Sequence, residues 1–116
     1  MADYTYVVLS NPVPGREAEF EDWYGNTHLD DVVAVEGFTS ARLYKLADPS
    51  AEGAPPQRYM AIYTMTTGDP GKLLDDLRIL VETGQMMMSE AFSDEGLATH
   101  LYGPITPLIE KNKAPR

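Results

Sequence analysis

The stretch EFEDWYGNTHLDDV, residues 19–32, predicts an amphipathic helix. Across residues 17–35 the bulky side chains recur at the i, i+3, i+4 spacing of one helix face: Phe20, Trp23, Tyr24, His28, Leu29, Val32 and Val33. Gly25 and Asn26 are weak helix formers, so we expect the helix to break or bend there.

Strands are predicted on both sides of this helix. Residues 4–10 (YTYVVLS) and residues 38–46 (FTSARLYKL) are rich in the β-branched and aromatic residues that favour strands. Residues 47–57 form a polar loop with several prolines, and residues 58–66 (RYMAIYTMT) read as a third strand. The second and third strands therefore form a hairpin with a long connection.

A second helix and a fourth strand complete the pattern. The helix begins with Asp69 as N-cap and Pro70 at its first position, and Gly84 ends it. Residues 98–109 read as the last strand. The order β-α-β-β-α-β predicts one α+β domain over residues 1–116, with a ferredoxin-like fold in which a four-stranded antiparallel sheet carries two helices on one face.

Both faces of the predicted sheet are apolar. Within residues 4–9 and 59–65 the side chains on either face are mostly aromatic or aliphatic, whereas a sheet with one wet face shows polar residues at alternate positions. Two helices in a small domain cover only one face. The second face is therefore predicted to pack on another copy of the chain, in a homodimer.

The composition excludes several classes of function. The chain has no cysteine, which rules out disulfides, thiolate metal sites and cysteine nucleophiles. Its formal net charge of −9 repels phosphate backbones and anionic lipids, and no apolar stretch reaches the roughly 20 residues that span a bilayer. We expect a cytoplasmic protein without nucleic-acid or membrane partners. The sequence has no phosphate-binding glycine loop, nucleophile elbow or dinucleotide fingerprint.

Residues 20–42 carry a pattern that resembles a known family. Its parts are Trp23-Tyr24, His28 with Leu29, Asp31-Val32, Gly37-Phe38 and Ala41-Arg42. Together with the element order, the pattern resembles the dimeric α+β barrel superfamily, and within it the small EthD-like single-domain proteins. The resemblance implies a cleft between the helices and the concave side of the sheet. The superfamily includes cofactor-free monooxygenases, lactone isomerases, polyketide cyclases, haem-degrading enzymes and proteins without known activity.

His28 is the main candidate for a catalytic residue. It follows Tyr24 by one helical step of four, and Asp31 lies three residues further on, close enough to orient one ring nitrogen. In such a cleft the pKa of His28 would lie near neutrality, and the imidazole would act as general base on an acidic C–H or phenol. Tyr24 would donate a hydrogen bond to the oxyanion. The structural alternative is that His28 caps a helix end or satisfies a buried carbonyl.

Six further side chains are predicted to bind the substrate: Trp23, Arg42, Tyr63, Met87, His100 and Tyr102. Each also has an ordinary structural explanation, such as core packing for Trp23, a surface ion pair for Arg42 and a dimer contact for Met87. The methionines at 86–88 could form a lid together with the 47–57 loop. Two histidines make a weak metal site, so neither a metal nor another cofactor is expected.

Three kinds of function remain open. The first is a small cofactor-independent enzyme that performs acid/base chemistry on an apolar, aromatic or polyketide-like small molecule, as a lyase, isomerase or cyclase. A cofactor-free monooxygenase, in which the substrate anion itself reacts with oxygen, shares its first step. The second is a non-catalytic dimeric domain that binds an apolar metabolite. The third is a haem-binding protein with His28 or His100 as axial ligand, although haem propionates usually require basic partners.

Overall fold

A computed structural model describes residues 1–112 as a βαββαβ chain, the predicted order. The strands are β1 (Ala2–Pro12), β2 (Phe38–Lys45), β3 (Tyr59–Thr67) and β4 (Phe92–Tyr102). The first helical unit comprises α1 (Glu17–Trp23), the π-helical turn η1 (Tyr24–His28) and α2 (Leu29–Val33), and the second helix is α3 (Pro70–Glu82). None of the helices within these residues has the length and apolar character needed to cross a bilayer.

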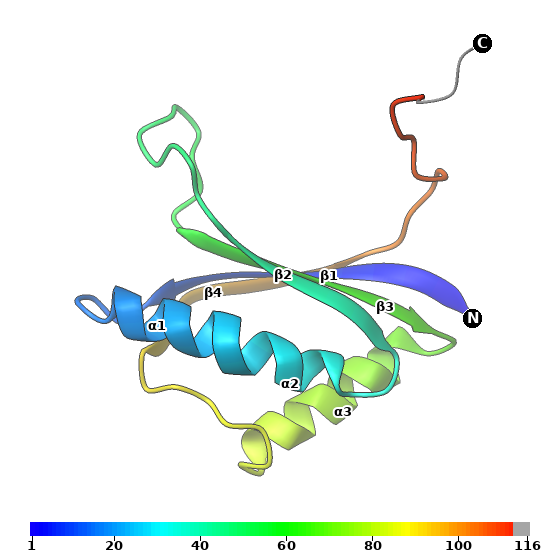
Figure 1. Cartoon of the computed structure of the whole chain (residues 1–116), viewed down its shortest axis with the longest axis horizontal. Coiled ribbons are helices and arrows are strands. Elements are labelled where there is room, and N and C mark those ends of the chain that lie inside the picture. The colour runs from blue at the N-terminus through cyan, green and yellow to red at the C-terminus, as the bar shows by residue number, and fades with distance from the viewer. Residues whose placement is uncertain (113–116) are drawn as a thin grey trace.

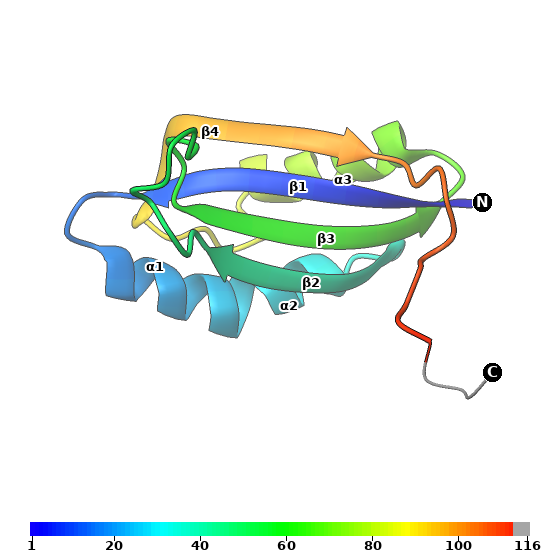
Figure 2. The same ribbon diagram turned by 90° about the horizontal axis from the view of Figure 1, so that it is seen from above.

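The strands form one antiparallel sheet in the order β2-β3-β1-β4. Both helical units lie on the same face of this sheet (Figure 1). Seen from above, α1 and α2 lie toward β2, and α3 lies toward β4 (Figure 2). The predicted α+β ferredoxin-like fold is confirmed.

Side chains alternate between a face that the helices cover, the inner face, and the opposite outer face. The inner-face residues of β3 are at most 2 % exposed: Tyr59, Ala61, Tyr63 and Met65. On the outer face the central apolar residues are only half-buried: Val7, Leu9, Met60 and Ile62. The predicted two-sided pattern is confirmed, and no helix of residues 1–112 covers the outer face.

The first helical unit bends where the weak helix formers predict it. The backbone N–H of Leu29 donates to the carbonyl of Tyr24, five residues earlier, so Gly25 and Asn26 lie in one wide turn. This unit packs on the inner face through Phe20, which is fully buried, with its ring centroid 4.8 Å from that of Tyr59.

The boundaries of α3 follow its caps. As predicted, Pro70 occupies the first turn, and the Asp69 side chain accepts a hydrogen bond from the Lys72 backbone N–H at 3.0 Å. Gly84 follows the end of the helix with a φ of 79°, a conformation that favours glycine.

The predicted fourth strand, residues 98–109, is wrong at both ends. β4 begins at Phe92 and contains a bulge, because β1 advances from Leu9 to Asn11 while β4 runs back from Ala98 to Ser93. Gly96, with a φ of 76°, supplies the backbone conformation that the bulge needs. The strand ends at Tyr102, before Gly103 and Pro104, because proline cannot donate a ladder hydrogen bond.

Candidate functional site

A cavity of about 480 Å³ opens between the inner face and the helices. The sheet contributes one wall, the first helical unit a second and α3 a third. Their main side chains are, in that order, Tyr6, Val8 and Tyr63; Tyr24, His28 and Val32; and Leu74, Leu77 and Val81. This apolar lining with a few polar groups is typical of a small-molecule site.

The mouth of the cavity is charged. Arg78 and Glu82 of α3 and Asp94 of β4 line it, and the side chains of Arg78 and Glu82 are 54 % and 60 % exposed. Arg78 donates to both carboxylate oxygens of Glu82, at 2.9 and 3.0 Å, and to Asp75 at 3.2 Å. The one permanent positive charge among the described lining residues is therefore already paired with two carboxylates.

His28 lies in the wall of the cavity and is only 8 % exposed. Its ring stacks on the indole of Trp23, with centroids 4.5 Å apart, and meets the Tyr24 ring edge-on at 5.1 Å. Its Nδ1 atom is buried and finds no hydrogen-bond partner within residues 1–112. A buried polar atom without a partner is costly, so a hydrogen-bond partner supplied by a ligand would be favourable.

Burial sets the protonation state of His28. It lowers the pKa of the imidazole to about 4, and the negative charge of Asp31 raises it only in part. The expectation of a pKa near neutrality is therefore wrong, because desolvation outweighs the nearby carboxylate. Asp31 acts on His28 through its charge and makes no hydrogen bond to Nδ1. At neutral pH His28 is an uncharged proton acceptor.

Tyr24 and Tyr63 form a second polar feature of the cavity. The Tyr63 hydroxyl donates to the Tyr24 oxygen at 3.4 Å. Burial raises the pKa of Tyr24 to about 12 and raises the pKa of Tyr63 as well. Both phenols therefore stay protonated at neutral pH. Because Tyr63 donates its proton to Tyr24, the Tyr24 hydroxyl is the one that can donate to an oxygen atom of a ligand.

Three predicted binding residues lie on the outer face, away from the cavity: Arg42, His100 and Tyr102. Residues paired across antiparallel strands share a face, and these three pair with outer-face residues: Ile62, Val7 and Thr5, respectively. His100 and Tyr102 do lie together, with ring centroids 6.2 Å apart, but His28 and His100 share no cleft. Within residues 1–112 no three His, Cys, Asp or Glu side chains converge on a potential metal site.

Trp23 and Met87 support the cavity from outside its lining. The Trp23 indole N–H donates to the Met87 carbonyl at 3.1 Å, while the Met87 side chain is 65 % exposed and Met88 lines the cavity instead. The predicted lid of the methionines and the 47–57 loop is wrong for the loop, which rises on the side of the sheet opposite the helices (Figure 1). Of that pair, only the methionine segment adjoins the cavity.

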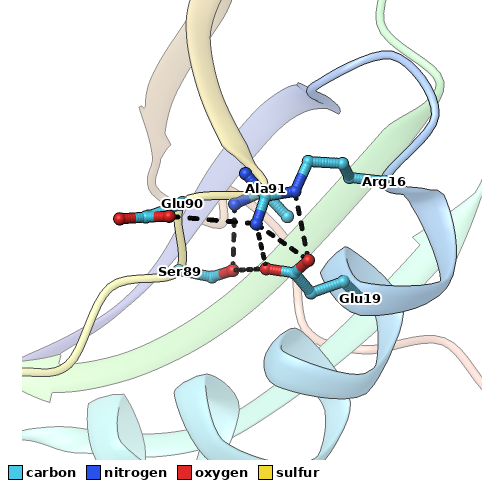
Figure 3. A network of polar contacts seen from close by, with 5 residues as sticks. All are labelled: Arg16, Glu19, Ser89, Glu90 and Ala91. Atoms are coloured by element: carbon cyan, nitrogen blue, oxygen red, sulfur yellow. Dashed lines mark hydrogen bonds and ion pairs between the residues drawn. The ribbon is translucent and has the colours of Figure 1, made fainter.

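A polar network anchors the segment that follows α3. Ser89, a lining residue, donates to Glu19 at 3.4 Å and accepts from the Ala91 backbone N–H at 3.0 Å (Figure 3). Glu19 in turn pairs with Arg16 at 2.7 Å, and Arg16 lies 3.9 Å from Glu90. These contacts hold the cavity wall between α3 and β4 against the start of α1.

Several lining residues escaped the sequence analysis. Leu74, Leu77 and Val81 recur at helical spacing along the second helix, but that spacing cannot distinguish a core contact from a cavity wall. Leu97 and Thr99 lie near the bulge in β4, so their inward direction depends on a register that the sequence does not show.

The chain resembles solved structures in shape but not in sequence, since no family model and no curated protein matches it. A candidate antibiotic biosynthesis monooxygenase from Bordetella bronchiseptica superposes with a TM-score of 0.62 at 19 % identity, over 91 % of this chain and 100 % of that one. The haem-degrader MhuD from Mycobacterium tuberculosis, solved with two haems in its active site, superposes with a TM-score of 0.62 at 10 % identity, over 90 % and 98 %.

An EthD family protein from Bacillus halodurans superposes with a TM-score of 0.52 at 11 % identity, over 90 % of this chain and all of that one. Each likeness extends over nearly the whole of both chains, so it concerns the arrangement of all the helices and strands. At these identities the likenesses confirm the predicted resemblance at the level of the fold.

Proposed function

We propose that this protein is a small cofactor-independent enzyme in which His28 takes a proton from an apolar aromatic or polyketide-like substrate. The observation that carries the proposal is a buried, uncharged imidazole whose Nδ1 has no partner in residues 1–112, in the wall of an apolar cavity. The acidic C–H or phenol of the substrate would supply the missing partner.

The surrounding groups suit this first step. His28 is neutral at pH 7 and ready to accept a proton, although a low pKa makes it a weak base in the free protein. A substrate anion formed beside it would stabilise the imidazolium, because an adjacent opposite charge raises the pKa of a buried histidine. The Tyr24 hydroxyl, which accepts a hydrogen bond from Tyr63, would donate its own proton to the oxyanion.

The structural neighbours favour oxygenation among the reactions that begin in this way. Among them are candidate monooxygenases from Bordetella bronchiseptica and Shewanella loihica. In this version the carbanion of an activated methylene gives its electrons to O₂; one oxygen atom becomes a carbonyl and the other leaves as water, so R₂CH₂ and O₂ yield R₂CO and H₂O. Lyase, isomerase and cyclase reactions share the proton transfer and have no such support.

Isotope labelling tests the proposal. Incubation with neutral polycyclic phenols that carry an activated methylene, under ¹⁸O₂, should give products with one ¹⁸O atom and consume an equal amount of oxygen. His28→Gln should lower the rate by about a hundredfold or more, the scale of a lost general base. The matched control is His100→Gln. It changes the second histidine of the chain, which lies on the outer face away from the cavity, and should retain activity. Equal rates for His28→Gln and the unchanged protein would contradict the role of His28.

The two remaining functions make different predictions. A purely binding domain would show ligand affinity without turnover, and His28→Gln would leave that affinity intact. Haem is favoured by the likeness to MhuD and by the position of His28, but the mouth suits it poorly, because Arg78 is already paired and carboxylates surround it. A Soret band that forms on adding haemin and disappears in His28→Ala would support haem binding. The absence of any spectral change would exclude it.

The outer face leads us to propose a homodimer. Its half-buried apolar residues and the exposed Tyr44 have no helix over them within residues 1–112. A second copy placed on this face would bury them and leave both cavities on the outside of the pair.

A further inference from the structure

The geometry points to a cavity that admits uncharged ligands and excludes carboxylates, with Asp75, Glu82 and Asp94 as the residues that set this specificity. The inference rests on the proposed function and narrows its substrate class to neutral phenols and ketones. It follows from the charges at the mouth, from the state of Arg78 and from the groups deeper in the cavity.

Two of the three acidic residues are exposed lining residues of the cavity, and the third contacts Arg78. Glu82 and Asp94 line the cavity from α3 and β4, and Asp75 contacts Arg78 one helical turn before it. These three negative charges face one positive charge, on a chain whose formal net charge is −9. An approaching carboxylate would therefore meet a negative potential, which lowers both its local concentration and its rate of entry.

Arg78 is the side chain that would otherwise bind an anion. Its guanidinium already uses both terminal nitrogens, at 2.9 and 3.0 Å from Glu82 and at 3.2 Å from Asp75. A ligand carboxylate would have to displace one of these partners to gain a bidentate contact. Glu82 and Asp75 thus withhold Arg78 from anionic ligands.

The interior offers a carboxylate no counter-charge. Apart from Arg78, Glu82 and Asp94, the described polar lining residues carry hydroxyls or the imidazole and no positive charge: Tyr6, Tyr24, His28, Tyr63, Ser89 and Thr99. His28 lines the cavity as an uncharged ring that is 8 % exposed, so it offers a carboxylate no positive charge. A carboxylate that entered would lose its hydration without gaining a counter-charge, whereas a phenol or ketone would lose little and gain hydrogen bonds.

Two probes of similar shape test the inference. 1-Naphthol is uncharged at neutral pH, and 1-hydroxy-2-naphthoate adds a carboxylate to the same ring system. Calorimetric titration of the full chain in low salt should give a dissociation constant for the naphthoate that is on the order of tenfold or more above that for 1-naphthol. The ratio should shrink in high salt, because salt screens charges at an exposed mouth.

Variants identify the residues responsible. In Glu82→Gln/Asp94→Asn the naphthoate should bind about as well as 1-naphthol, because the repulsion falls and Arg78 loses a partner. Glu52→Gln removes one negative charge from the exposed β2–β3 loop, away from the cavity, and should keep the discrimination of the unchanged protein. Affinity for 1-naphthol should be similar in all three proteins.

The outcomes separate this inference from the proposed function. Equal affinities for the two probes in the unchanged protein, or a discrimination that survives in Glu82→Gln/Asp94→Asn, would overturn the inference and leave the proton-transfer proposal standing. Failure of both probes to bind would overturn both, since each requires the cavity to hold a neutral aromatic ring. The inference is supported if the naphthoate binds weakly to the unchanged protein and to Glu52→Gln but binds well to Glu82→Gln/Asp94→Asn.

Discussion

His28 shows how a residue's environment can reverse a reasonable expectation from its neighbours in sequence. Asp31 is three residues away and does favour the charged imidazole, but the tight packing of Trp23 and Tyr24 around the ring removes water and favours the neutral form. The grouping of Tyr24 and His28 could be predicted from helical spacing. The depth of burial could not, because it depends on the sheet and on α3.

The lowered pKa of His28 couples its protonation to folding. In the unfolded chain the pKa returns to about 6.5, and in the folded protein it is about 4, so the unfolded state binds more protons between these values. The contribution of neutral His28 to stability is fully present above pH 6.5 and is lost as the pH falls toward 4, by about 3 kcal/mol. Urea unfolding at a series of pH values should show this loss.

His28→Gln supplies the control, because glutamine does not titrate while the acidic residues titrate in both proteins. The difference in unfolding free energy between the unchanged protein and the variant should decrease from pH 7 to pH 4. A difference that stays constant over this range would show that His28 is not buried as described.

At the scale of elements, the wide turn η1 explains why Trp23 and His28 stack. Residues five apart in a regular α-helix point about 140° away from each other, but a π-helical turn brings them into line. The weak helix formers Gly25 and Asn26 predict a break at this place. They do not predict a π-helical turn, since several distortions would satisfy the same sequence.

Bulges account for the other errors at this scale. Simple alternation along β2 would place Phe38 and Arg42 on one face, but the register shifts between Phe38 and Ser40, so Arg42 turns outward. In β4 a larger shift lets the pairing with β1 continue from Ala98 back to Phe92, so the strand begins six residues before the predicted residue 98. The hydrophobic pattern gives the existence of a strand, whereas its register depends on pairing with its neighbours.

Two glycines of these elements should respond oppositely to the same substitution. Gly25→Ala should raise the unfolding free energy by about 0.5–1 kcal/mol, because a Cβ there meets nothing within 4 Å and alanine favours the helix. Gly37→Ala should lower it by about 2 kcal/mol or more, because φ is 109° and the Cβ would lie 2.8 Å from Leu73 Cδ2. Chemical denaturation measures both, and destabilisation by Gly25→Ala would show that the wide turn needs glycine.

At the scale of the whole molecule, the two apolar faces of the sheet were the most informative feature of the sequence. The helices bury one face, which forms the core and the cavity, and they leave the other with half-buried aliphatic residues. Sequence alternation was enough to predict both faces. From the sequence, a second copy of the chain could be proposed as the partner that covers the outer face, but its position on that face could not be predicted.

A charge on the outer face should therefore dissociate the proposed dimer. Light scattering at micromolar concentration should give the mass of two chains for the unchanged protein and of one chain for Ile62→Lys, because a buried unpaired ammonium is costly. Ile79→Lys makes the same change on the surface of α3, where the side chain is already 46 % exposed, and should remain dimeric. A monomeric unchanged protein would rule out the dimer.

The central claim is that His28 is a buried, neutral group in a ligand-binding cavity, and an NMR titration of its ring protons tests it most directly. The signal is assigned by its loss in His28→Gln, since the chain has only two histidines. We expect a pKa of about 4 in the free protein and a clear change in the shifts and pKa of His28, but not of His100, on adding 1-naphthol. A pKa near 6.5 that no such ligand alters would contradict the account and make residues 19–32 part of the scaffold alone.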